Sequence, residues 1–144
     1  MKKLLFLSFL MALVIPVFAQ QVKPETLAKR QKRKSLTVEE WNTAVGARQA
    51  TLDHKTTYDT LGRKIEEIEY ASYGQKSRVV SEYADPLDPA SKVLREIEYN
   101  DRDKVVRIRV FEYNEDGTKR HQYNYYPNGK LESTKSYKMI IREE

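Results

Sequence analysis

A tyrosine followed four residues later by a glycine recurs through the C-terminal two-thirds of the chain, and this repeat limits the possible folds more than any other feature. The complete motif occupies residues 58–62, 70–74, 113–117 and 125–129. A copy that begins at Tyr99 carries Asp103 in place of the glycine, and Tyr83 and Tyr137 continue a spacing of about 12 residues. A short period of this kind marks a repeat architecture.

Each period divides into a four-residue turn and a strand of about eight residues, which is an ordinary strand length. Pro127, Asn128 and Gly129 show the turn chemistry most clearly, because proline presets φ and glycine tolerates the positive φ that follows. β-Branched and aromatic residues are concentrated between the turns. Short connections favour antiparallel neighbours. The sequence therefore predicts an all-β fold, an antiparallel up-and-down meander of about seven strands, with its longest connection at 84–91.

The repeat also suggests a binding surface. If each turn contains a one-residue bulge, alternate residues from 105 to 113 point to one face of the sheet. We expect that face to bear the candidate partner-binding residues Tyr113, Tyr123, Tyr125, Tyr137, Arg107 and Arg109. Tyrosine offers a large contact area at a small entropic cost, and arginine pairs with carboxylate or phosphate. The alternative is that the segment around Trp41 covers this face and the tyrosines form a core.

The first 19 residues have the pattern of a secretory signal peptide. Lys2 and Lys3 precede an apolar run that ends at Phe18, and Ala19 suits the cleavage position. We expect cleavage after Ala19 and export to the periplasm or the exterior of a bacterium. The chain has no cysteine, which excludes disulfides and cysteine-ligated metals.

Residues 20–34 are polar and basic and lack apolar periodicity. We predict a flexible tether there, which is either a solvated spacer or, through residues 23–34, a peripheral contact with an anionic membrane surface. Residues 35–144 are then a single β-repeat domain, with its repeat units at about 58–137.

A short N-terminal helix is predicted over residues 35–46. Thr37 and Glu40 fit a capping box, and apolar residues recur at helical spacing around Trp41. We expect this helix to cover one end or edge of the sheet, with Trp41 as its anchor.

Residue patterns that would indicate catalysis are missing from the sequence. His54 and His121 fall on different predicted strands without the spacing of a metal site. Phosphate-loop, nucleophile-elbow and dinucleotide motifs are also absent. We therefore predict no enzyme activity, no catalytic residues, no cofactor and no metal. Nucleic-acid binding is not expected either, because the excess positive charge of the chain lies N-terminal to the repeats.

Two of the repeats resemble known families. Residues 58–63, Tyr-Asp-Thr-Leu-Gly-Arg, resemble the YD (RHS) repeat, whose consensus begins Tyr-Asp-x-x-Gly-Arg. Residues 125–131, Tyr-Tyr-Pro-Asn-Gly-Lys-Leu, are similar to the MORN-like repeat of bacterial exported proteins often labelled as antitoxins. The resemblance covers about 58–137 and implies a series of β-hairpins. In long YD-repeat proteins it would imply a β-shell that encloses a toxin.

Two classes of function remain open. The first is an exported, non-catalytic binding module of the bacterial envelope that presents its sheet to an envelope protein or glycan. The second is a structural or assembly protein that acts through sheet-edge pairing or self-association, which the apolar segment 135–142 suggests. The sequence leaves the oligomeric state open.

Overall fold

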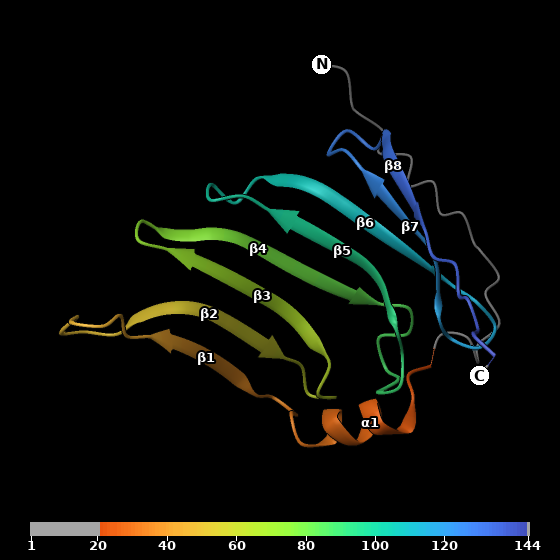
Figure 1. Cartoon of the computed structure of the whole chain (residues 1–144), viewed down its shortest axis with the longest axis horizontal. Coiled ribbons are helices and arrows are strands. Elements are labelled where there is room, and N and C mark those ends of the chain that lie inside the picture. The colour runs from red at the N-terminus through yellow and green to blue at the C-terminus, as the bar shows by residue number, and fades with distance from the viewer. Residues whose placement is uncertain (1–20, 144) are drawn as a thin grey trace, which may run out of the picture.

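The computed structural model describes residues 21–143, which form one antiparallel sheet and a short helix (Figure 1). The predicted signal peptide, residues 1–19, lies outside the described part of the chain. The sheet has eight strands in the order β1 to β8, so each strand pairs with its neighbours in sequence. The elements are α1 (Pro24–Gln31), β1 (Thr37–Asn42), β2 (Thr51–Tyr58), β3 (Lys64–Ala71), β4 (Gly74–Tyr83), β5 (Val93–Tyr99), β6 (Val105–Tyr113), β7 (Lys119–Tyr125) and β8 (Leu131–Ser136). The predicted up-and-down meander is confirmed, with one more strand than expected.

A one-residue bulge follows every tyrosine turn. In the pair β6–β7, Glu112 lies opposite His121, whereas the next residue, Tyr113, lies opposite Lys119. The register shifts at the equivalent tyrosine in each pair from β2–β3 to β7–β8. Gly129 has a φ of 85°, as the turn chemistry predicts. The bulges assumed from the sequence are therefore present throughout the repeat.

The bulges place successive tyrosines on opposite faces of the sheet. Residues two apart in a regular strand share a face, and an extra residue in the strand reverses that alternation. Lys119 shares a face with Tyr113, and the bulge that follows moves Tyr125 to the other face. Successive strands also run in opposite directions, so successive tyrosines lie at opposite ends of the sheet. One set comprises Tyr58, Tyr83, Tyr113 and Tyr137, and the other comprises Tyr70, Tyr99 and Tyr125.

Helix α1 packs against only one of these two faces. Figure 1 shows it at the end of the sheet where β2 and β4 finish. There the guanidinium groups of Arg33 and Arg30 lie over the rings of Tyr58 and Tyr83. We call the face with these two tyrosines the helix-side face and the opposite one the open face. Among the described residues, Phe111 is the only large apolar side chain that is buried, so the sheet is a single layer with little conventional core.

The helix predicted over residues 35–46 is wrong, because Thr37–Asn42 forms the edge strand β1. The side chain of Trp41 is 57% exposed and anchors nothing. β-Branched residues suit a strand, and the edge of β2 offers the backbone partners that a strand requires.

The flexible tether predicted over residues 20–34 is also wrong for most of its length, because it contains α1. Pro24 suits the first position of a helix, and Glu25 in the first turn complements the helix dipole. Lys29 and Arg30 in the last turn complement the opposite, negative end of the helix dipole. Helices this short are marginal alone, so contacts with the sheet must stabilise α1.

Candidate functional site

Two arginines organise the sheet end next to α1 by binding the loop between β4 and β5. The side chain of Arg63, only 6% exposed, donates hydrogen bonds to three carbonyl oxygens of this loop at 2.7–3.1 Å. Its Nε donates to the carboxylate of Asp59 at 2.8 Å. Arg30 Nη1 donates to two further loop carbonyls, each at 2.7 Å. The longest connection of the sheet is therefore held in one conformation.

Asp59 and Arg63 in the first tyrosine turn have a structural role. Asp59 Oδ1 accepts hydrogen bonds from the backbone N–H groups of Leu61 and Arg63, each at 2.9 Å. The same carboxylate orients the Arg63 side chain toward the loop. Hydrogen bonds within this turn fix its conformation and position the guanidinium group that binds residues 85–88.

The ring of Tyr83 lies between these two arginines. The Cζ atoms of Arg63 and Arg30 are 4.5 Å and 5.3 Å from its ring centroid, distances typical of cation–π contacts. Its hydroxyl donates to the Lys64 carbonyl at 2.7 Å. Burial of the ring raises the pKa of Tyr83 to about 12, although the two arginines favour its charged form. Tyr83 is therefore a neutral packing residue that connects helix, hairpin and loop.

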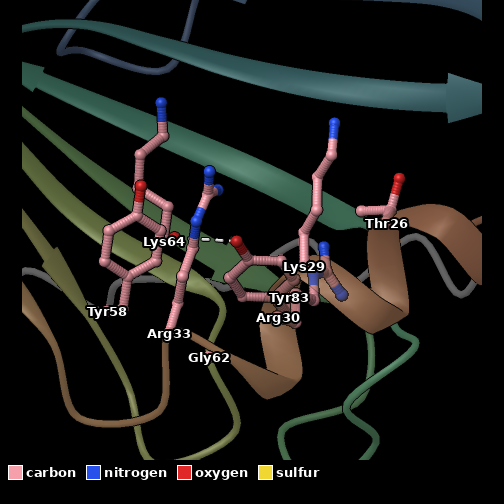
Figure 2. Close-up of a pocket in the computed structure, with 8 residues that line it drawn as sticks. All are labelled: Thr26, Lys29, Arg30, Arg33, Tyr58, Gly62, Lys64 and Tyr83. Atoms are coloured by element: carbon pink, nitrogen blue, oxygen red, sulfur yellow. Dashed lines mark hydrogen bonds between the residues drawn. The ribbon is translucent and has the colours of Figure 1, made fainter.

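A shallow cleft lies between α1 and the β2–β3 hairpin, with a volume of about 220 Å³ (Figure 2). It is lined by Thr26, Lys29, Arg30, Arg33, Tyr58, Gly62, Lys64 and Tyr83. Four of these side chains are basic and none is acidic. Sequence reasoning missed this site, although the spacing of residues 26, 29, 30 and 33 after Pro24 is that of one helix face.

The open face carries an apolar row across four strands. Register pairs link Val80 to Ile97, Ile97 to Ile108, and Ile108 to Tyr125. All four side chains are partly exposed. In residues 21–143, no helix or second sheet covers this row.

Ion pairs border the apolar row of the open face. Arg78 lies 3.3 Å from Glu66, and Arg95 lies 2.6 Å from Glu82. The guanidinium of Arg78 also stacks on the Tyr99 ring, with its Cζ atom 4.1 Å from the centroid. The open face thus has an apolar centre with a charged margin.

The six residues proposed as one binding surface do not share a face, which corrects the sequence-based assignment. Tyr123 lies opposite Val110 and Tyr125 opposite Ile108, so both are on the open face. The other four lie on the helix-side face: Arg107, Arg109, Tyr113 and Tyr137. The sequence-based register included the bulges but did not follow their effect on side-chain alternation through each turn.

The four residues on the helix-side face are occupied by contacts within the sheet. Arg107 donates two hydrogen bonds to Glu132, each at 3.1 Å, and Arg109 pairs with Glu98. The Tyr113 hydroxyl donates to the Val93 carbonyl at 2.6 Å, and burial raises its pKa. The Tyr137 hydroxyl donates to Gln122 at 3.3 Å. These side chains link strands within the sheet, and Arg107 reaches from β6 across β7 to β8.

Within residues 21–143, no group of three or more histidine, aspartate or glutamate side chains could hold a metal ion. No helix in the same range is long and apolar enough to span a membrane.

No protein-family model matches the chain, and no curated protein matches it. Among solved structures, one similar chain is a S. aureus TarM mutant in complex with Fondaparinux, alpha-GlcNAc-glycerol and UDP. The sequences are 18% identical, the match covers 78% of this chain, and the TM-score is 0.28. This chain spans 21% of the length of that one.

Proposed function

We propose that the chain is an exported, non-catalytic binding module of the bacterial envelope, and that its open face binds a partner protein. The observation that supports this function is the partly exposed row Val80, Ile97, Ile108 and Tyr125, uncovered within the described residues. The signal-like sequence of residues 1–19 and the resemblance of the repeats to those of exported bacterial proteins support the location.

The composition of the open face favours a protein partner. Protein interfaces combine an apolar centre with a polar margin, and the ion pairs Arg78–Glu66 and Arg95–Glu82 border the apolar row in this way. Tyr125 extends the row with a large, rigid side chain of the type that dominates binding energy. The row lies on hydrogen-bonded strands, so little ordering entropy is lost when a partner binds.

Site-specific photocrosslinking in the producing bacterium tests the proposal. A photoreactive phenylalanine analogue is placed at Tyr125, on the open face, or at its neighbour Asn124, on the helix-side face. We expect a discrete crosslinked protein from position 125 and none from position 124. The absence of a product at 125, or the same product from both positions, would contradict the proposal. A crosslink from 125 to a second copy would favour self-association instead.

A second candidate function is assembly through the edge strand β8. The residues after this strand include Met139, Ile140 and Ile141, which are 58%, 76% and 90% exposed. The outer edge of β8 pairs with no other strand within the described residues, and such an edge can accept a strand from another chain.

Analytical ultracentrifugation over a range of concentrations tests the assembly function. If β8 mediates assembly, the wild-type chain forms oligomers and Ile140→Lys weakens them. A matched substitution at another exposed apolar residue, Leu87→Lys, then leaves the oligomers unchanged. A wild-type chain that remains monomeric at all concentrations would contradict this function.

A further inference from the structure

We propose that the cleft between α1 and the β2–β3 hairpin is a binding site for a phosphate group. The cleft lies on the helix-side face, whereas the proposed protein-binding row lies on the open face. The two proposals therefore rest on different residues and can fail separately.

The helix brings its polar residues to one wall of the cleft. Thr26, Lys29 and Arg30 are spaced by three residues and one residue, which places them on one side of α1. Arg33 lies in the turn just after the helix and continues this wall. Lys64 adds a fourth cation from the facing hairpin. Figure 2 shows Lys29, Arg33 and Lys64 extending to the same side of the cleft. Ammonium and guanidinium donors from α1, the turn after it and the hairpin thus line the same cleft.

The positive charge of the cleft is only partly neutralised by the protein. The Nη1 atom of Arg30 bonds to two neutral carbonyl oxygens, and loss of hydration lowers its pKa. Arg33 stacks on the Tyr58 ring, with its Cζ atom 5.2 Å from the centroid. Of the four cations, Lys64 has a close carboxylate partner, Glu67, at 2.8 Å. The nearby Asp59 carboxylate is already bonded to Arg63. A bound anion would offset this unbalanced charge.

The walls of the cleft are fixed before any ligand binds. Gly62 lies directly against the backbone of Arg30, with no space for a side chain between hairpin and helix. Arg30 and Arg63 attach both elements to the loop between β4 and β5. Walls that are already packed together avoid the entropic cost of bringing helix and hairpin to the ligand.

Phosphate suits this donor set better than a carboxylate does. A phosphate group carries up to two negative charges and at least three acceptor oxygens. Arg33 has a planar guanidinium that can donate two parallel hydrogen bonds to phosphate, and Lys29 adds a compact charge. The phosphate could belong to a lipid headgroup or to a soluble molecule, and both present the same chemistry to the cleft.

Calorimetric titration of the purified full chain with pyrophosphate tests the site, with malonate as a dicarboxylate control. We expect saturable binding of pyrophosphate at one site per chain, and binding of malonate weaker by about tenfold or more. Cosedimentation with phosphatidylcholine vesicles, with or without phosphatidylglycerol, identifies the source of the phosphate. Sedimentation only with phosphatidylglycerol, reversed by pyrophosphate, assigns the site to lipid headgroups. Pyrophosphate binding without cosedimentation assigns it to soluble phosphates.

The decisive comparison uses two double variants that remove the same charges. Lys29→Gln with Arg33→Gln changes the cleft and leaves the loop-binding Arg30 in place. Lys104→Gln with Arg48→Gln removes two exposed cations from the β5–β6 and β1–β2 connections. These connections lie at the end of the sheet away from α1 (Figure 1). We expect the cleft variant to weaken pyrophosphate binding about tenfold and the control variant less than about twofold.

Three results would overturn the proposal. The first is no saturable binding of pyrophosphate together with no phosphatidylglycerol-dependent sedimentation. The second is malonate binding as tight as pyrophosphate binding, which would indicate a general anion site. The third is equal weakening in the two double variants, which would show that net charge alone attracts the anion. Unfolding midpoints of both variants, measured in urea, verify that each remains folded.

Discussion

The backbone of Arg30 packs directly on Gly62, so closely that a methyl group at Gly62 would overlap the Arg30 carbonyl group. Gly62 also has a φ of 78°, a conformation that side chains disfavour. This contact holds α1 against the first tyrosine turn, although the two residues are far apart in sequence. The glycine of the first repeat therefore serves helix docking as well as turn formation.

Substitution of Gly62 by alanine should destabilise the protein more than the same substitution at Gly129. The two glycines have similar φ values, 78° and 85°, but Gly129 has open space where a side chain would point. The conformational cost of about 1 kcal/mol is common to both, and displacement of α1 adds about 1–2 kcal/mol at Gly62 alone. Urea unfolding measures the difference. Equal losses of stability would show that α1 does not dock on this turn.

Arg63→Leu should lower the free energy of unfolding by about 3–5 kcal/mol, because it removes the charged partner of Asp59 Oδ2 and the donor to three loop carbonyls. Arg102→Leu is the control, since Arg102 is exposed in a turn, and it should change stability by less than about 0.5 kcal/mol. Limited proteolysis should cleave the loop at 84–91 faster in the Arg63 variant. Equal cleavage rates would contradict the role assigned to this arginine.

The partly buried ring of Tyr83 should make stability depend on pH in the alkaline range. Its pKa is raised from 10.0 to about 12 in the folded chain, so the folded state retains a proton that the unfolded state releases. The stabilisation is complete below pH 10 and is lost as the pH rises toward 12. Wild type should therefore lose stability more steeply than Tyr83→Phe between these values.

The difference between wild type and Tyr83→Phe isolates this titration, because the other tyrosines and the lysines are common to both proteins. Urea unfolding at several alkaline pH values measures it. Parallel stability curves for the two proteins would show that the Tyr83 hydroxyl titrates normally.

The Tyr123 hydroxyl should contribute to stability through Glu112, to which it donates a hydrogen bond at 2.9 Å. Tyr123→Phe should cost about 0.5–1.5 kcal/mol. Tyr73→Phe is the matched control and should cost nothing measurable, since Tyr73 is 69% exposed. A Tyr123→Phe protein as stable as wild type would show that this hydrogen bond is no stronger than one to water.

Local turn chemistry was enough to predict the meander. The Pro127, Asn128 and Gly129 turn and its relatives favour reversal and a bulge whatever surrounds them. Strand-forming residues between the turns then leave antiparallel pairing as the simplest arrangement. The period of about 12 residues was therefore enough to predict the fold class.

Helix α1 and strand β1 could not be predicted from local sequence, because both depend on contacts with distant residues. Residues 24–31 have few apolar side chains, and their helix gains its partners from Gly62, Tyr83 and the loop at 84–91. Residues 37–42 have weak local preference for either structure and extend because the edge of β2 is available. Contacts across the chain outweighed local propensity at both places.

The candidate sites depended on tertiary structure in the same way. Residue spacing predicted that Tyr113, Tyr123 and Tyr125 share one binding face with two arginines. Each bulge reverses the alternation of side chains between the two faces, so these residues are divided between both. The cleft required α1 to lie beside a hairpin about 30 residues later in the chain, and no local pattern specifies that approach. The conformation of each turn and strand follows from residues near it in sequence. The grouping of basic side chains around the cleft follows from which surfaces of the chain pack together.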